Sequence, residues 1–244
     1  MSDTSQGPGW WQASDGKWYP PEQAPGYQPP AESGGGGGGA SVSLDFGAAF
    51  NWAWKQFTDN LGAWLTISVV VAVIYLVFFG AALVINSFFV AIVLRLLGYV
   101  VGAMIALGFI RASLASTRGE KPELSMMFQT DHLGPYILAS ILFAILFTVG
   151  FVVCCVGEIA VVLFLGFYGF FIVDKDQGAT DSLSSSFNLV KDNFGNVLLL
   201  LIIAWALYAV GVITCGIVLL ATGPLAYLLL AYGFRTLNGE TIAA

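Results

Sequence analysis

The chain has 244 residues, of which 57% are hydrophobic and only 10% carry a charge. Soluble domains carry about 25% charged residues, so this composition, with a mean hydropathy of +0.81, excludes a soluble globule. The net charge of −6 and the lack of a basic stripe argue against a nucleic-acid partner. The sequence therefore predicts an integral membrane protein whose surroundings are the lipid bilayer.

Residues 1–40 are predicted to form a disordered cytoplasmic tail, separate from a membrane domain at 41–244. The tail holds six of the nine prolines and the glycine run Gly34–Gly39. Such a segment buries too little apolar surface to offset the entropy that it would lose on ordering. The glycine run is typical of a flexible linker.

An aromatic motif lies inside this tail, at residues 9–22. Asp15-Gly16 is a tight-turn signal between two aromatic pairs and predicts a small hairpin with stacked rings. The motif resembles the tryptophan-rich GWW…DGxWYPPE element at the N-termini of many actinobacterial membrane proteins. It is interpreted either as a docking element for a cytoplasmic protein partner or the membrane surface, or as an inert tail. The candidate docking residues are Trp10, Trp11, Trp18 and Tyr19.

The membrane part contains three copies of one pattern. Each copy opens on Asp-Asn-x-Gly or Asp-His-x-Gly and closes on Gly-Phe. Each apolar block in between is long enough for two spanning helices of about 20 residues. The predicted fold class is therefore an all-α polytopic membrane bundle of six transmembrane helices, arranged as three repeated hairpins at about 44–111, 122–173 and 180–236. The opening and closing glycines are Gly62 and Gly108, Gly134 and Gly169, and Gly195 and Gly233.

Amphipathic stretches precede the first and third copies, and a shorter one starting near Pro122 precedes the second. Their apolar residues recur at helical spacing, which predicts helices lying flat in the headgroup region. Ser43 or Asp45 is expected to cap the first of these helices, and Thr180 or Asp181 the third.

The basic residues predict the orientation in the membrane. Eight of the nine lie outside the blocks between opening and closing glycines, on a single side, after the second, fourth or sixth span or before the first. Positively charged residues stay on the cytoplasmic side. We therefore expect a multi-pass protein of the cytoplasmic membrane with both termini in the cytoplasm.

Few residues suggest chemistry. His132 occupies the slot that asparagine fills in the other two copies, so it is interpreted as a polar cap rather than a catalytic group. Pro224 predicts a kink or an interruption of the sixth span. No cofactor or metal is expected, because the cysteines lack metal-ligand spacing and are interpreted as small buried hydrophobes. These cysteines are Cys154, Cys155 and Cys215.

Between the opening and closing glycines of the three copies, Arg95 and Glu158 are the only Asp, Glu, Lys or Arg residues. Charges within membrane spans are costly and suggest a functional site. Both are expected near the outer ends of their spans, where they would meet as a rim pair or line an outward-facing pocket. The alternative is that each side chain reaches the interface separately.

The membrane part resembles six-span bacterial integral membrane proteins in which a surface helix ending in NxG precedes an apolar hairpin. Related regions form the membrane portion attached to glycerophosphodiester phosphodiesterases. The likeness is best in the third copy, at Ser184–Glu240, with SFxLVKxNFG and YGFRxLxGE. No active-site residue is carried over, because the chain has none of the acidic and histidine clusters that such hydrolysis needs.

The sequence leaves three classes of function. The first is a non-enzymatic membrane scaffold that recruits partners through its tail. The alternative is a small-molecule or lipid carrier with a cavity between the hairpins. An intramembrane enzyme is disfavoured, since acid–base catalysis needs convergent titratable groups.

Overall fold

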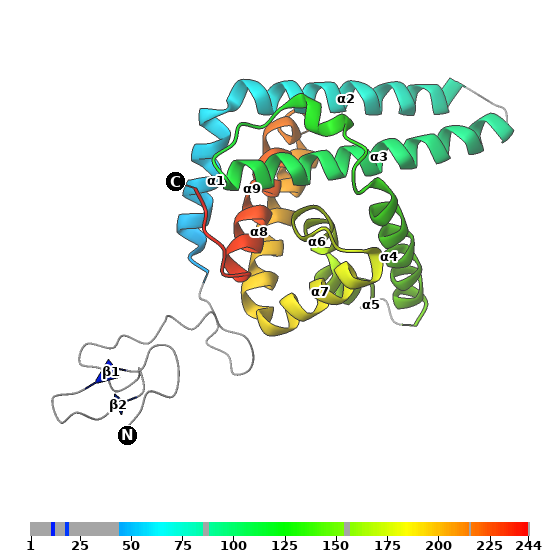
Figure 1. Ribbon diagram of the computed structural model, residues 1–244. Coiled ribbons are helices and arrows are strands. Elements are labelled where there is room, and N and C mark those ends of the chain that lie inside the picture. The colour runs from blue at the N-terminus through cyan, green and yellow to red at the C-terminus, as the bar shows by residue number, and fades with distance from the viewer. Residues whose placement is uncertain are drawn as a thin grey trace. The chain divides into compact units, whose positions relative to one another are not determined.

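The computed structural model describes residues 11–12, 18–19, 44–84, 88–153, 157–214 and 216–243 (Figure 1). The chain divides into two compact units, residues 1–40 and residues 41–244. Apart from the two short strands of the first unit, the secondary structure of the described residues is helical. The all-helical membrane domain expected from the sequence is therefore present.

The described part of the first unit is a pair of short strands. Strand β1 (Trp11–Gln12) pairs antiparallel with β2 (Trp18–Tyr19), with Trp11 opposite Tyr19. This pairing confirms the backbone of the predicted hairpin. The predicted ring stacking depends on side chains that the structure does not describe. Trp10 and the tail residues predicted to be disordered lie outside the described residues.

The second unit contains nine described α-helices and a short 3-10 helix, η2. Consecutive long helices pack in pairs, α2 with α3, α4 with α5, and α8 with α9, and α2 and α3 run side by side in Figure 1. The bounds are α1 (Phe46–Asp59), α2 (Leu61–Val84), α3 (Phe88–Thr117), η2 (Leu124–Phe128), α4 (Leu133–Val153), α5 (Gly157–Leu165), α6 (Tyr168–Lys175), α7 (Ala179–Asp192), α8 (Phe194–Ile213) and α9 (Leu219–Leu237).

Five described segments are long and apolar enough to cross a bilayer. They are residues 61–78, 92–117, 133–152, 157–175 and 194–213. Helix α9, the expected sixth span, is not among them, and its 19 residues include Arg235 in the last turn. It packs against α8, α3, α1 and α2, and 11 of its residues are buried. Helix α9 is therefore the central helix of the bundle.

The surface helices α1 and α7 are both amphipathic and 14 residues long. Asp45 caps α1, because its Oδ1 atom accepts a hydrogen bond of 2.9 Å from the backbone N–H of Ala48. The expected cap of α7 is wrong: the helix begins after Gly178, and no side chain caps it. The second copy has the 3-10 helix η2 in place of a surface α-helix, as its shorter pattern suggested.

The fourth span is broken, which the sequence analysis did not predict. Helix α5 ends at Leu165 and α6 begins at Tyr168. The hydroxyl of Ser186, from α7, donates to the carbonyl of Phe164 at 2.9 Å and accepts from the N–H of Phe167 at 3.1 Å. One buried side chain thus satisfies a backbone donor and a backbone acceptor beside the break.

The expected interruption at Pro224 is wrong, because α9 continues through it. Pro224 is the sixth residue of the helix, where a proline removes the hydrogen bond to the carbonyl four residues earlier. Helix α9 is instead held in place by its packing against α8, α3, α1 and α2. Phe234 lies at the centre of the aromatic core, with its ring 5.4 Å from that of Phe170 and 5.0 Å from that of Phe171.

Candidate functional site

A cavity with a volume of about 610 Å³ lies between α2, α3, α8 and α9. Ligand pockets in proteins are typically about 300–1,000 Å³, mostly apolar with a few polar groups. The described lining carries no charged residue. It consists of Ser68, Val71, Ala72, Tyr75, Leu76, Gly102, Ile105, Ala106, Phe109, Tyr208, Gly216, Leu219, Leu220, Gly223, Pro224 and Tyr227.

The local sequence explains why these side chains line one space. On α2 the lining positions 68, 71, 72, 75 and 76 follow the three-to-four spacing that places residues on one helix face. Small residues on α3 and α9 leave the opposite walls open. Gly223 is buried, and a Cβ atom added to it would meet no atom within 4 Å. A buried glycine with open space beside it thus marks the wall of the cavity.

The cavity opens on one side and has polar hydroxyls on the other. Tyr75 and Leu76 are 51% and 69% exposed, so the cavity is open along α2. Ser68 is 5% exposed, and its Oγ atom has no hydrogen-bond partner among the described residues. The hydroxyls of Tyr208 and Tyr227 interact with each other across α8 and α9. The site therefore offers neutral hydrogen-bonding groups in apolar surroundings.

Tyr208 and Tyr227 belong to a larger group of tyrosines, whose members come from all three pairs of helices. Tyr136 packs against Tyr168, with ring centroids 5.3 Å apart, and Tyr75 and Tyr99 lie near enough to affect it electrostatically. The hydroxyls of Tyr99 and Ser140 lie 2.6 Å apart. The tyrosine cluster has one member from each of α2, α3, α4, α6, α8 and α9, namely Tyr75, Tyr99, Tyr136, Tyr168, Tyr208 and Tyr227.

The tyrosine cluster was not predicted from the sequence. A signal was present, because each predicted span carries a tyrosine within an apolar run. A hydroxyl in such a run needs a hydrogen-bond partner when it is buried. The tyrosines could therefore have been interpreted as partners of one another.

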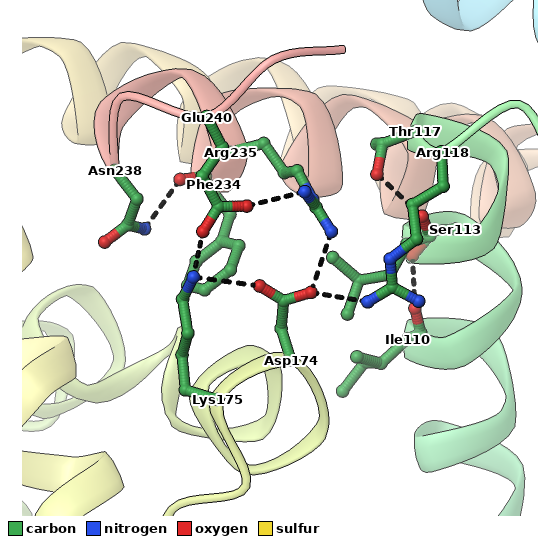
Figure 2. Close-up of polar contacts among 11 residues, drawn as sticks. Ile110, Ser113, Thr117, Arg118, Asp174, Lys175, Phe234, Arg235, Asn238 and Glu240 are labelled. Carbon is green, nitrogen blue, oxygen red and sulfur yellow. Dashed lines mark hydrogen bonds and ion pairs between the residues drawn. The ribbon is translucent and has the colours of Figure 1, made fainter. Parts of the chain in front are cut away.

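A second site is an ionic cluster centred on Asp174, whose side chain is 4% exposed (Figure 2). Its Oδ1 atom lies 2.6 Å from Nη2 of Arg118 and 2.9 Å from Nη2 of Arg235. Its Oδ2 atom lies 3.3 Å from Nζ of Lys175. Glu240 completes the ionic cluster by pairing with Lys175 and, at 2.7 Å, with Nη1 of Arg235.

The ionic cluster connects elements that are far apart in the sequence. Arg118 directly follows α3, Asp174 and Lys175 end α6, and Arg235 lies in the last turn of α9. The segment after α9 is also held by Ala243, whose N–H donates to the carbonyl of Thr117 and whose carbonyl accepts from Trp52. These contacts fix the ends of the helices that form the cavity walls.

A smaller cavity of about 300 Å³ lies beside the ionic cluster and has charged walls. Arg111 lines it and donates to the backbone carbonyls of Gln129, at 3.0 Å, and Asp131. His132 lines it too, and its Nε2 atom lies 3.0 Å from Oδ1 of Asp176. The histidine thus has a partner from the end of α6, and it stands directly before α4.

The structure does not join the two charges proposed as a rim pair. Arg95 is exposed on α3, and Glu158 is half-buried in the first turn of α5. No ion pair between these two described residues is present, and neither lines the larger cavity. Trp11, Trp18 and Tyr19 lie in the strands of the first unit.

Two further expectations concern ligands and relatives. Among the described residues, no group of three His, Cys, Asp or Glu side chains lies close enough to hold a metal ion; the cysteines lie outside the described residues. Comparisons with family models, characterised proteins and solved structures found no match to this chain. The resemblance to the membrane portion of phosphodiesterase-linked proteins therefore stays a prediction.

Proposed function

We propose that this protein binds an apolar small molecule or a lipid between its helices and carries it within the membrane. The observation that supports this function is the cavity of about 610 Å³ with an uncharged lining. The hydroxyls of Tyr75, Tyr208 and Tyr227, the members of the tyrosine cluster that line the cavity, would hold the polar end of the bound molecule. Binding is favoured over catalysis, because the lining offers no acid–base pair that titrates near neutral pH.

The proposed setting is the cytoplasmic membrane, with six spans in three hairpins. Helix α9 would be the sixth span, shielded from lipid by the helices around it. Helices α1 and α7 would lie in the interface, with their apolar faces toward the bundle.

Both termini would face the cytoplasm. The carboxylate of Asp174 is surrounded by Arg118, Lys175 and Arg235. These basic residues lie at the ends of α3, α6 and α9. This gathering supports a single basic side, as the positive-inside rule requires.

The test is to fill the cavity. Wild-type protein and the Gly223→Leu variant are extracted in native membrane discs, and the bound lipids and small molecules are identified by mass spectrometry. We expect a molecule enriched with the wild type to be lost from Gly223→Leu, since the new side chain enters open space. Gly62→Leu is the matched control, because Gly62 is exposed and also meets no atom within 4 Å. Identical bound molecules in wild type and Gly223→Leu would reject the proposed function.

A second candidate is the scaffold function of the tail, which the paired strands β1 and β2 favour, because they form an ordered aromatic element. Deletion of residues 1–40 should then abolish co-purification of a cytoplasmic partner and leave membrane insertion intact. Unchanged co-purification after the deletion would exclude this candidate.

A further inference from the structure

We infer that the larger cavity selects an uncharged amphiphile, with a hydroxyl or ester group as its polar end, over a charged phospholipid. This inference rests on the proposed function and specifies its ligand. It follows from three properties of the cavity: its lack of charge, its unpartnered hydroxyl and its opening along α2.

The first property is the absence of charge from the described lining. Moving an ionised phosphate into an apolar space is strongly unfavourable without a cation to pair with it. None of the described lysines and arginines lines the larger cavity. Arg111 and Arg118 line the smaller cavity, and Lys175 and Arg235 belong to the ionic cluster. A phosphate group would therefore remain unpaired in the larger cavity, whereas a neutral headgroup would not.

The second property is the buried hydroxyl of Ser68, which lacks a partner within the described chain. In membrane helices a serine hydroxyl usually bonds to the backbone carbonyl four residues earlier, as that of Thr66 does with Gly62 at 2.7 Å. The Ser68 hydroxyl makes no such bond, although the side chain is 5% exposed. A buried hydroxyl without a partner is costly, and a ligand oxygen would supply the missing hydrogen bond.

The tyrosine hydroxyls extend this polar wall. Tyr227 and Tyr208 line the cavity and interact with each other, and Tyr75 also lines it, near enough to Tyr227 to affect it electrostatically. Each hydroxyl can donate and accept. These hydroxyls suit a ligand that carries a hydroxyl or an ester group, because both of these ligand groups remain uncharged when they leave water.

The third property is the route of entry. Tyr75 and Leu76 stand at the open side and are the most exposed lining residues of α2. In the proposed setting this side faces lipid chains rather than water. An uncharged amphiphile reaches that depth of the bilayer readily, whereas a phosphate group stays at the interface.

The inference is tested with two lipids that share their chains and differ by one phosphate. Full-length protein is reconstituted in discs of dioleoyl phosphatidylcholine that contain a trace of isotope-labelled dioleoylglycerol or dioleoyl phosphatidate. Lipid retained after transfer to detergent is counted by native mass spectrometry. We expect dioleoylglycerol to be retained at least about tenfold more than dioleoyl phosphatidate.

Two conservative variants test the polar wall. Ser68→Ala and Tyr227→Phe each remove one hydroxyl, and each should lower dioleoylglycerol retention roughly three- to tenfold, the effect of one hydrogen bond. The controls are Thr66→Ala on α2 and Tyr232→Phe on α9, whose hydroxyls belong to no lining residue. Retention in both controls should equal that of the wild type.

The outcomes separate the inference from the proposed function. Equal retention of both lipids, or unchanged retention in Ser68→Ala and Tyr227→Phe, would overturn the inference. If Gly223→Leu still removed the lipid in those cases, the cavity would bind lipid without this selectivity. If the Gly223→Leu variant retained as much dioleoylglycerol as the wild type, the proposed function itself would be overturned.

Discussion

Asn60 and Asn193 end helices α1 and α7 in the same way. The side-chain Nδ2 of each donates to the backbone carbonyl four residues earlier, at 3.1 Å in both cases. Their backbone angles are also alike, with φ/ψ of −115°/27° and −128°/34°. In each case a long apolar helix begins at the next residue. Two distant parts of the chain therefore make the same turn from an amphipathic helix into a long apolar helix.

The closing glycines give the first prediction. A Cβ atom added to Gly108 would lie 2.5 Å from Met127 Sδ, and one added to Gly169 would lie 2.6 Å from Ile110 Cδ1; at Gly233 it would collide with Leu200. Alanine at any of the three should lower the free energy of unfolding by about 1–3 kcal/mol. At Gly108 the backbone of Met127 must move, and at Gly169 and Gly233 the buried side chains of Ile110 and Leu200 must repack. Thermal unfolding in detergent, followed by tryptophan fluorescence, measures the change.

The opening glycines are the controls for this series. A Cβ atom added to Gly62, Gly134 or Gly195 would meet no atom within 4 Å. Alanine there should leave stability unchanged or raise it by up to about 1 kcal/mol, since alanine favours a helix over glycine. Equal losses at opening and closing glycines would contradict the packing described for the repeats.

Much of the fold could be predicted from the sequence. Apolar length alone predicted the spans, and five of them meet that test in the structure. The break between α5 and α6 could not be predicted, because it depends on a hydroxyl from α7. A lone Gly166 in an apolar run does not distinguish a broken helix from a continuous one.

The candidate site was less predictable than the fold. Arg95 and Glu158 were chosen because intramembrane charges are rare, yet rarity says nothing about distance. The cavity depends on how four helices pack, and its polar groups are ordinary tyrosines and a serine. The ionic cluster around Asp174 could not be predicted for a similar reason. Its ion pairs depend on basic residues from three helix ends that only the fold brings together.

Ser186 gives the second prediction. Ser186→Ala should lower the free energy of unfolding by about 1–3 kcal/mol, because it leaves the carbonyl of Phe164 and the N–H of Phe167 without that partner. The matched control is Ser182→Ala, one turn earlier on the same buried face, whose hydroxyl bonds only within α7. Hydrogen exchange at Phe167 should rise in the first variant alone. Equal exchange in the two variants would show that Ser186 does not stabilise the break.

Asp174 gives the third prediction. Asp174→Asn leaves three cations with one carboxylate fewer and should lower stability by about 3–5 kcal/mol, as when a buried ion pair loses one partner. Asp59→Asn is the control, because the pair between Asp59 and Lys55 is exposed, at 3.7 Å. That change should cost less than about 1 kcal/mol. Similar costs for both changes, measured by thermal unfolding, would mean that the ionic cluster does not hold the helix ends together.

His132 gives the last prediction. Its φ of 62° lies in the left-handed region, as does that of its partner Asp176 at 52°, and they are the only such non-glycine residues in the described chain. Alanine in this region costs about 1–2 kcal/mol, whereas glycine and, to a lesser degree, asparagine adopt it readily. All three substitutions remove the contact with Asp176 equally, so His132→Gly should be the most stable, His132→Asn next and His132→Ala the least. The order is opposite to that expected at Gly62, where the backbone is helical and alanine is favoured. Thermal unfolding of the three variants decides the matter: if alanine matches glycine at position 132, the left-handed turn before α4 is not required by the fold.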